Sequence, residues 1–371
     1  MSKVKYGVYI GRFHPFHTGH MHVVTEAKKH CENLIVVVGS ANVSRSPKNP
    51  FPANWRTSMV DNALMEAGWN RNHFTVTTAD DDWYNDTVWT KNIRDAVHEA
   101  VTHMLERGNG FIDPDIDLEA EFNQIAIVGC AKDKATEAYI KMFPEWIPPI
   151  LVDPKPNGNG KPIDATYLRD NFYETGVWDE KFVPESVLKI LSYMQEMNPD
   201  HFKWLKREYE FYRDYKKAWE SAPYPPTIHC VDNLVVQSGH ILLIQRGKDS
   251  GIGQWALPGG HIEQLETFKD AAIRELREET LVSDHKGKIP AKILESFIDE
   301  RATWTNDYPG RSLRGRVITT VFKYDLPDTG KLFHVKGDDD AAFAKWVHVS
   351  DIHKLEFYDD HYFMIKKMLN I

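Results

Sequence analysis

The N-terminal half of the sequence alternates short apolar runs with longer segments of helical period. The apolar runs cover 5–10, 34–38 and 124–128, and the helical segments cover 19–30, 55–67 and 88–107. Parallel neighbouring strands need a long crossover connection, and a helix usually supplies it. The alternation therefore predicts an α/β domain in which crossover helices cover a parallel sheet.

The pattern changes after this half. Residues 185–219 have helical spacing and many charges, are interrupted by Pro199, and are followed by the proline-rich run 221–226. This composition is typical of a helical connector that continues into a stiff linker. Two strand-like runs, 227–236 and 240–246, then flank a short turn of the kind that joins a hairpin.

A chain of 371 residues is too long for one ordinary hydrophobic core. We predict domains over 1–184 and 227–371, joined by a connector over 185–226. No apolar run is long enough to cross a membrane, so a cytoplasmic protein with no membrane partner is expected. The net charge of −9 disfavours nucleic acid as a partner. The three cysteines lack the paired spacing of a zinc site and are expected to be reduced.

The first strand-like run leads into a segment rich in glycine, histidine and proline. It reads Gly-Arg-Phe-His-Pro-Phe-His-Thr-Gly-His over 11–20, and a helical pattern follows. A helix N-terminus has unpaired N–H groups and a partial positive charge, which suit a polyphosphate. His17 and His20 are three residues apart, so both imidazoles can reach one phosphate. We interpret the segment as a nucleotide site in which the imidazoles stabilise charge on phosphate oxygens.

Residues 11–20 resemble the G-x-F-x-P-x-H-x-G-H motif of the HxGH nucleotidyltransferase superfamily, and in particular the nicotinamide mononucleotide (NMN) adenylyltransferases of archaeal type. The resemblance extends to 49–51, 82–89 and 163–169. Asp164 stands where that family usually has serine. The resemblance implies a Rossmann-like nucleotidyltransferase domain that uses ATP as a substrate.

The same resemblance implies roles for individual residues. His17 and His20 are assigned to the ATP phosphates and Arg169 to the β- and γ-phosphate end, all three as catalytic residues. Trp89 is assigned to stacking on the nicotinamide ring, with a plain core position as the open alternative. For Arg12 the alternative is a surface ion pair. The residues expected to bind ATP or NMN, besides Trp89, are Gly11, Arg12, Phe13, Gly39, Ser40, Asn49, Arg56 and Thr166.

The second half contains a predicted helix with clustered carboxylates. Thr267 and Asp270 form the capping-box pattern of a helix start. Glu275, Glu278 and Glu279 then fall on one helical face. Three carboxylates so close together repel one another unless a cation is bound, although any one of them alone could be a solvated surface residue. Hard oxygen ligands suit Mg²⁺, with Mn²⁺ as the alternative.

Residues 260–279 resemble the Nudix box, G-x5-E-x7-R-E-U-x-E-E-x-G-U. The resemblance implies a C-terminal α/β/α Nudix domain with a mixed sheet. It also implies that Gly260 and the three glutamates hold the metal, and that Glu278 and Glu279 are catalytic. Arg274 is expected to orient the glutamates through salt bridges rather than to contact substrate.

The end of the predicted Nudix helix and the segment after it each suggest a further feature. Leu281 replaces the glycine that usually ends the Nudix helix in a left-handed conformation, which suggests a reshaped helix end. The aromatic and basic segment that follows is expected to bind the Nudix substrate. Its candidate residues are Trp304, Arg311, Arg314 and Arg316, of which at least one arginine is expected to be an ordinary strand-edge charge.

Nearly the whole chain thus resembles bifunctional NMN adenylyltransferase/Nudix hydrolase proteins. The resemblance implies that the first domain makes NAD⁺ from ATP and NMN, and that the second hydrolyses ADP-ribose to AMP and ribose 5-phosphate. ATP, NMN, NAD and ADP-ribose are the expected partners, and a homo-oligomer is left open. Two alternatives also stay open. One is a different nucleotidyltransferase fused to a Nudix hydrolase of other specificity, and the other is a regulator that senses nucleotides without chemistry.

Overall fold

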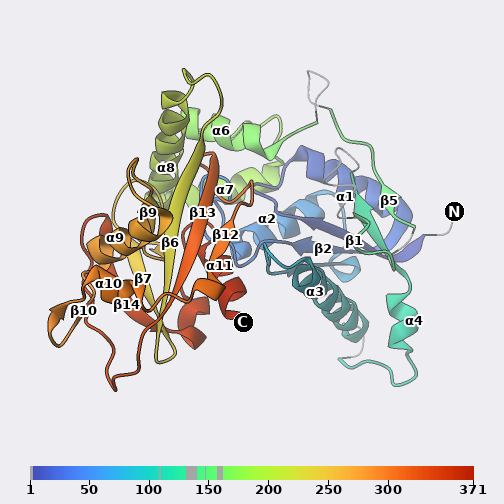
Figure 1. Ribbon diagram of the computed structural model, residues 1–371. Helices are drawn as coiled ribbons and strands as arrows, with labels where there is room; N and C mark the ends of the chain where they lie inside the picture. Colours follow the sequence, from blue (N-terminus) through green and yellow to red (C-terminus); the bar gives the residue numbers. More distant parts are fainter. Residues whose placement is uncertain (1–2, 108–109, 131–139, 147, 157–161) are drawn as a thin grey trace. The chain divides into compact units, whose positions relative to one another are not determined.

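The computed structural model describes residues 3–107, 110–130, 140–146, 148–156 and 162–371 (Figure 1). The chain forms two compact units, Met1–Lys206 and Arg207–Ile371, and the division between them falls inside helix α8 (Pro199–Ala218). The connector predicted over 185–226 is therefore divided between the units. Among the described residues, no helix has the length and apolar character needed to cross a membrane.

The N-terminal unit is built on a parallel sheet with the strand order β3-β2-β1-β4-β5. Its strands are β1 (Val4–Gly11), β2 (Cys31–Val38), β3 (Phe74–Thr78), β4 (Ile125–Gly129) and β5 (Ile150–Leu151). The three predicted strands are β1, β2 and β4, and the parallel sheet is confirmed. The apolar-run pattern misses β3 because threonines alternate with its two apolar residues over only five positions.

Helices cover both faces of this sheet. Helices α1 (Thr18–His30), α2 (Ala53–Glu66) and α3 (Asp86–Glu106) pack on the sheet. The unit also contains α4 (Leu118–Phe122), α6 (Ala165–Thr175), α7 (Glu185–Met197) and the 3-10 turn η1 (Arg71–His73). Helix α3 begins where the Asn85 side chain accepts a hydrogen bond from the N–H of Val88. Ile93 and Val97 of α3 pack into one core with the inward residues of β1 and β2. Figure 1 shows α1 and α3 on opposite sides of the sheet.

The C-terminal unit is built on a mixed sheet with the order β12-β13-β6-β7-β14, to which β8 and β9 add at β7 and β6. Its strands are β6 (Thr227–Gln237), β7 (His240–Arg246), β8 (Trp255–Ala256), β9 (Gly259–His261), β12 (Trp304–Asn306), β13 (Arg316–Asp325) and β14 (Ala341–His348), and a separate ribbon joins β10 (Ser283–Asp284) and β11 (Gly287–Lys288). Strands β6 and β13 are parallel. Strands β6 and β7 form the predicted hairpin, whose turn residues Ser238 and Gly239 both have positive φ.

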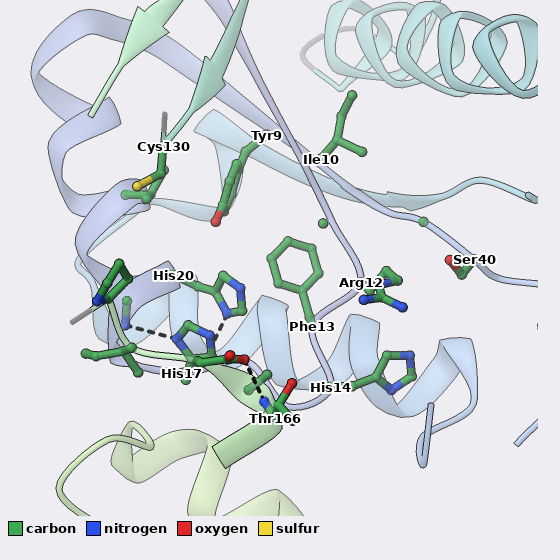
Figure 2. Close-up of a pocket in the computed structure, with 18 of the residues that line it drawn as sticks. Tyr9, Ile10, Arg12, Phe13, His14, His17, His20, Ser40, Cys130 and Thr166 are labelled. Atoms are coloured by element: carbon green, nitrogen blue, oxygen red, sulfur yellow. Dashed lines mark hydrogen bonds between the residues drawn. The ribbon is translucent and has the colours of Figure 1, made fainter. Parts of the chain in front are cut away.

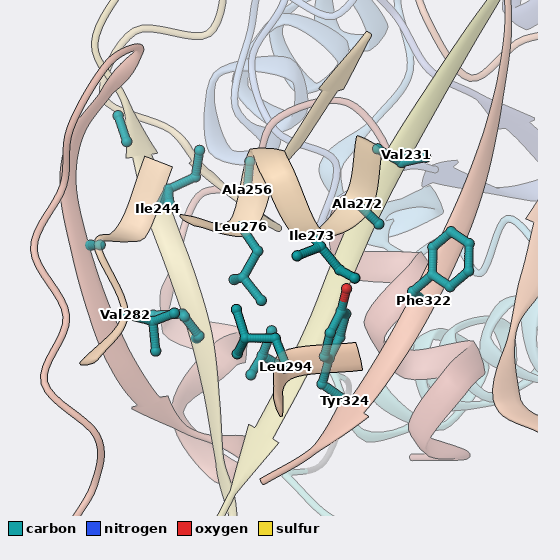
Figure 3. Packing of buried hydrophobic residues seen from close by; sticks show 14 of the residues in the cluster. Val231, Ile244, Ala256, Ala272, Ile273, Leu276, Val282, Leu294, Phe322 and Tyr324 are labelled. Atoms are coloured by element: carbon teal, nitrogen blue, oxygen red, sulfur yellow. The ribbon is translucent and has the colours of Figure 1, made fainter. Parts of the chain in front are cut away.

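Helices pack on both faces of the mixed sheet as well. They are α9 (Phe268–Thr280), α10 (Ala291–Glu295), α11 (His361–Leu369) and the later part of α8, together with the 3-10 turns η2 (Glu300–Ala302) and η3 (Val349–Lys354). Val231 of β6 shares a buried cluster with Leu276 of α9 (Figure 3). The preceding residue, Cys230, packs instead with Tyr215 of α8. Because successive strand residues point to opposite faces, this confirms the predicted α/β/α layering.

Helix α9 ends at Leu281, which itself takes the left-handed conformation. Its φ is 43° and its ψ is 37°, and its N–H donates to the carbonyl oxygen of Arg277 at 3.2 Å. The usual geometry of the helix end is thus retained without glycine. This conformation is strained for leucine, because its Cβ atom lies close to the backbone, whereas glycine has no Cβ.

Replacing Leu281 by glycine should therefore change the stability of the unit little. We expect Leu281→Gly to be neutral or stabilising by up to about 1 kcal/mol, because relief of the left-handed strain offsets the greater unfolded-state freedom of glycine. Urea denaturation checks this. Leu276→Ala, at a fully buried position of the same helix, serves as the control and should cost about 2–5 kcal/mol. A comparable loss in Leu281→Gly would mean that the leucine side chain is a core residue.

Candidate active sites

A cavity of about 540 Å³ opens where β1 and β2 end in the N-terminal unit. Ligands of open parallel sheets commonly bind at the carboxyl ends of the strands. Ten of the residues predicted for the first site line this cavity, namely Gly11, Arg12, Phe13, His17, His20, Gly39, Ser40, Trp89, Thr166 and Arg169. They come from four separate parts of the unit, which the fold brings together.

The two histidines of the motif cap helix α1. The Nδ1 atom of His17 accepts the N–H of Gly19 at 3.1 Å, and the Nδ1 atom of His20 accepts the N–H of His17 at 3.2 Å (Figure 2). Their rings stack with centroids 3.7 Å apart. A nitrogen that accepts a hydrogen bond carries no proton, so each neutral ring has its proton on Nε2. The backbone of the helix start therefore fixes both imidazoles as Nε2–H donors.

Two glycines of the motif make room for aromatic rings. A Cβ atom at Gly19 would lie 2.9 Å from Cε1 of His17, and one at Gly11 would lie 2.7 Å from the ring of Phe13. Phe13 is 2% exposed and meets His20 edge to face with centroids 4.9 Å apart. Any larger residue at these two positions would displace the rings. The glycines are thus needed by the imidazole pair, not only by the turn.

Arg169 reaches the cavity from helix α6. Its Nη1 donates to the carbonyl oxygen of His14 at 2.8 Å, and its Nη2 donates to Oγ1 of Thr166 at 3.3 Å. Burial lowers the pKa of this guanidinium. Asp164, the departure from the family serine, caps α6 by accepting the N–H of Thr166 at 2.8 Å. The aspartate therefore performs at the helix start the capping that a serine would also perform.

Arg56 has a different position from the one predicted. It is 1% exposed, does not line the cavity, and donates hydrogen bonds to main-chain carbonyl oxygens. Nε donates to Phe51 at 3.1 Å, Nη1 to Arg12 at 3.0 Å and to Gly39 at 2.6 Å, and Nη2 to Ser40 at 2.9 Å. Burial lowers its pKa to about 10. Arg56 thus ties the cavity-forming segments together and is not placed to contact a nucleotide.

Asn49 and Trp89 also have structural contacts. Asn49 is buried outside the cavity lining, and its Oδ1 accepts a hydrogen bond from Nη1 of Arg12 at 3.4 Å. Among the described residues Arg12 has no acidic partner, which disfavours the surface ion pair. Trp89 lines the cavity and also packs against Phe143, with ring centroids 5.8 Å apart. The core and ligand positions proposed for Trp89 are therefore compatible.

Sequence reasoning missed several residues that line the same cavity. Asp81 accepts a hydrogen bond from Oγ of Ser40 at 2.5 Å and stands just beyond the end of β3, the strand that the sequence pattern also missed. Lys48 and Lys155 add cations to the lining. His14 lies inside the motif, where its variable position gave no signal. Its burial, at 4% exposure, distinguishes it from an ordinary loop histidine.

The second site lies at the start and along one face of α9. Thr267 and Asp270 form the expected capping box. Arg274 donates to Glu266 at 2.7 and 3.0 Å, to Oε1 of Glu275 at 2.9 Å and to Oε2 of Glu278 at 3.0 Å. Hydrogen bonding to Glu266 is the main cause of the raised pKa of this arginine. Arg274 therefore contacts two of the three clustered glutamates, as expected.

The third glutamate is held by the backbone of β9. Oε2 of Glu279 accepts the N–H of Gly259 at 2.8 Å, and the residue is 5% exposed. Burial raises the pKa of Glu279 to about 8 and also raises the pKa of Glu275. A Cβ atom at Gly260 would lie 2.5 Å from Oε1 of Glu275. The strand backbone and two carboxylates are thus packed tightly around this point.

These residues suit a divalent cation in donor chemistry. Two carboxylates whose charged forms are disfavoured by burial gain most from a nearby positive charge. Among the described residues, however, no three His, Cys, Asp or Glu side chains already converge on one point as a metal centre would require. Glu275 and Glu278 both face Arg274 instead. The residues that would hold the ion are Glu275, Glu278, Glu279 and Gly260, after the two carboxylates turn from the arginine.

The predicted Nudix substrate residues are not equivalent. Arg311 is 5% exposed and makes a two-point ion pair with Asp360 at 2.8 and 3.0 Å. Burial opposes the charge of Arg311, but Asp360 outweighs it and raises the pKa. Two of the guanidinium nitrogens of Arg311 are therefore paired with a buried carboxylate, which the sequence did not predict. The ammonium group of Lys367 lies over the ring of Trp304, with Nζ 5.0 Å from the ring centroid, as in a cation–π contact.

The other two arginines lie near the parallel pair β6 and β13. Arg316, the first residue of β13, donates to the carbonyl oxygen of Asp307. The backbone N–H of Arg314 donates to Oγ of Ser312 at 3.4 Å, and within the described part of the chain the one hydrogen bond of its guanidinium is from Nε to the same Oγ at 3.5 Å. Its positive charge lowers the pKa of His261 after burial, the larger cause. Arg314 is therefore the predicted arginine that keeps most of its donors for a ligand.

Arg246 was missed by sequence reasoning, which treated 240–246 only as a strand. Its Nε donates to the carbonyl oxygen of Ser250 at 2.8 Å, and its guanidinium lies 4.1 Å from the ring centroid of Tyr358. Its charge also acts on Glu279 and on His261. The available signal was its place at the last residue of a predicted strand, next to the glycine that starts the following loop.

Two family models match the chain. Residues 8–171 match the cytidylyltransferase-like family, and residues 223–368 match the NUDIX domain. The fold and the two sites thus define a nucleotidyltransferase joined to a NUDIX domain.

Named relatives match each part. A nicotinamide/nicotinic acid mononucleotide adenylyltransferase of Acinetobacter baylyi is 28% identical over 209 residues, which are 56% of this chain and 95% of that protein. An ADP-ribose pyrophosphatase of Methanocaldococcus jannaschii is 36% identical over 136 residues, which are 37% of this chain and 69% of that protein. The chain spans about half, 48%, of a Halobacterium salinarum nicotinamide-nucleotide adenylyltransferase.

Solved structures match the whole chain. A bifunctional NMN adenylyltransferase/ADP ribose pyrophosphatase from Francisella tularensis has a TM-score of 0.84 at 30% identity, with 99% of both chains covered. A second structure of that Francisella protein, complexed with AMP and a Mn ion, has a TM-score of 0.82 at 29% identity and the same coverage. This chain belongs to the family of bifunctional NMN adenylyltransferase/ADP-ribose pyrophosphatase proteins.

The raised pKa of Glu279 gives a prediction for the metal-free protein. Its folded-state pKa of about 8 lies above the ordinary value of 4.5, so the fold favours the protonated form. Stability is therefore lost as pH rises from about 4.5 to about 8, by roughly 2–4 kcal/mol from this group. We expect chelator-treated wild type to lose more stability between pH 5 and pH 8 than Glu279→Gln.

Urea denaturation of both proteins at the two pH values measures this difference. Added Mg²⁺ should restore stability at pH 8 in the wild type and do so less in Glu279→Gln. Equal pH dependence in the two proteins would contradict the protonated, buried state of Glu279.

Proposed function

We propose that this chain makes NAD⁺ and pyrophosphate from ATP and NMN in its N-terminal unit, and hydrolyses ADP-ribose to AMP and ribose 5-phosphate in its C-terminal unit. The likeness of the whole chain to a bifunctional enzyme, at 30% identity and 99% coverage, carries the proposal. The paired imidazoles of the first unit and the glutamate helix of the second supply chemistry suited to each reaction.

Adenylyl transfer requires positioning and stabilisation of charge rather than covalent catalysis. A phosphate oxygen of NMN attacks the α-phosphorus of ATP, the bond to the β-phosphate oxygen breaks, and pyrophosphate leaves. The Nε2–H groups of His17 and His20 and the start of α1 would stabilise the charge that develops on the phosphate oxygens. Arg169 would hold the pyrophosphate end, with Thr166 fixing its guanidinium. Trp89 would stack on the nicotinamide ring.

Hydrolysis of ADP-ribose requires a water to attack a phosphorus of the pyrophosphate link. A divalent cation, Mg²⁺ or Mn²⁺, would neutralise the phosphate oxygens and lower the pKa of the attacking water. Glu275, Glu278, Glu279 and the Gly260 backbone would hold it. Arg274 would act as a positioning residue for the glutamates. Arg246 and Arg314 would bind the pyrophosphate, whereas Arg311 would stabilise the fold beside it.

The first test of this function separates the two activities. We expect His20→Ala to lower NAD⁺ formation from ATP and NMN by about a hundred-fold or more, since a donor to the transition-state charge is lost. Hydrolysis of ADP-ribose by the same protein should stay close to that of the wild type and serves as its folding control. Loss of both activities in a folded His20→Ala protein would contradict two independent sites.

The second test concerns the substrate of the C-terminal unit. We expect metal-dependent hydrolysis of ADP-ribose to be much faster than that of NAD⁺ at equal concentration, because cleaving NAD⁺ would destroy the product of the other unit. A pocket that pairs with the free ribose hydroxyl and has no space for nicotinamide would provide this selectivity. AMP is a product of both reactions, so chromatographic measurement of the AMP formed gives both rates. NAD⁺ cleaved as fast as ADP-ribose, or full activity in Glu279→Gln, would overturn the assignment.

A further inference from the structure

His14 lies in the loop between β1 and α1 and lines the first cavity (Figure 2). Its side chain is 4% exposed and stacks against Phe51, with ring centroids 6.0 Å apart and planes 23° apart. None of the roles given above to His17 and His20 involves this third imidazole.

The hydrogen bonds of His14 are incomplete. Its Nδ1 accepts the N–H of Phe51 at 3.4 Å, so the proton of the neutral ring is on Nε2. Nε2 is buried and has no hydrogen-bond partner among the residues that the structure describes. Burial, and then the charges of Arg56, Arg169 and Arg12, lower the pKa of His14 well below its ordinary value. The ring is therefore a neutral donor that has no acceptor.

The surroundings of the ring indicate which acceptor would fit. The carbonyl oxygen of His14 is held by Nη1 of Arg169 at 2.8 Å. Arg12 is a second cavity-lining cation from the residue two positions earlier, and Figure 2 shows it beside the His14 ring. Two guanidinium groups attract an anion, and a neutral N–H beside them prefers an oxygen acceptor. A phosphate oxygen satisfies both requirements.

We propose that the Nε2–H of His14 donates a hydrogen bond to a triphosphate oxygen of bound ATP, next to Arg169. The inference rests on the proposed adenylyl transfer and adds a third imidazole to the nucleotide site. A buried donor without a partner weakens the free protein and is paired only when the ligand arrives. His14 thus lowers the stability of the free enzyme, because its buried Nε2–H is unpaired, and strengthens ATP binding, because that N–H is paired in the complex.

The test uses three substitutions in the full-length protein. His14→Phe keeps an aromatic ring against Phe51 and removes the donor, whereas His14→Gln keeps an N–H donor at the distal position. His98→Phe is the matched control, because His98 stacks on Phe122 with centroids 4.0 Å apart and lies outside the cavity. The dissociation constant of ATP is measured by calorimetry without NMN. Urea stability, NAD⁺ formation and ADP-ribose hydrolysis are measured on the same proteins.

His14→Phe should weaken ATP binding by roughly ten- to a hundred-fold, which corresponds to one buried donor lost from a charged acceptor. Its stability without ligand should equal or exceed that of the wild type. His14→Gln should bind ATP within about five-fold of the wild type, and His98→Phe should bind it normally. ADP-ribose hydrolysis should be unchanged in all three proteins.

If the wild type makes NAD⁺ and His14→Phe binds ATP as tightly as the wild type does, the inference about His14 is wrong while the proposed function stands. Equal damage in His14→Gln, or a defect confined to the KM for NMN, would also overturn the inference. If His14→Phe does not fold, His14→Met takes its place as the variant without a donor. A wild type that neither binds ATP nor makes NAD⁺ would instead overturn the proposed function of the unit.

Discussion

The first site depends on one buried cation, Arg56. Its guanidinium donates to main-chain carbonyl oxygens of Phe51, Arg12, Gly39 and Ser40, which belong to three separate segments of the chain. A planar fork with fixed donor directions can join these segments, and a lysine with one charged nitrogen cannot. Leaving the carbonyl oxygens unpaired in a buried position would cost more than a single exposed ion pair contributes. Arg56 therefore holds three cavity-forming segments together through their backbone carbonyl oxygens.

The second site is organised by competing charges rather than by one anchor. Arg274 holds Glu275 and Glu278, while the N–H of Gly259 holds Glu279. The burial that raises the pKa of Glu279 makes an unpaired negative charge unfavourable there. A divalent cation would relieve this cost. Glu275 and Glu278 would then bind the cation in place of their present contacts with Arg274, which would still help to position them. The first site is thus preorganised by backbone contacts, whereas the second would be completed by a bound divalent cation.

Sequence patterns predicted the elements with strong periodicity and the residues inside compact motifs. The HxGH segment placed His17 and His20 at a helix start because cap, spacing and glycine all lie within ten residues. The same reasoning proposed ligand roles for Arg56 and Arg311 and did not foresee that both are buried with protein partners, backbone carbonyl oxygens for Arg56 and Asp360 for Arg311. A guanidinium that binds a phosphate and one that binds buried carbonyls or a carboxylate look identical in sequence. Only burial and partner geometry, which depend on distant segments, distinguish them.

In the proposed adenylyl transfer, the capping geometry would let His17 and His20 act on phosphates without being charged. Each Nδ1 accepts a backbone N–H, so a protonated ring would face a donor with another donor and lose its cap. The helix start thus favours neutral imidazoles with the proton on Nε2, and positive charge at the cavity is supplied by Arg12, Arg169, Lys48, Lys155 and the helix terminus. Neutral donors pay a smaller desolvation cost than cations when a nucleotide excludes water. In the proposed site, cationic side chains would therefore supply the positive charge, and the imidazoles would supply hydrogen-bond donors with fixed directions.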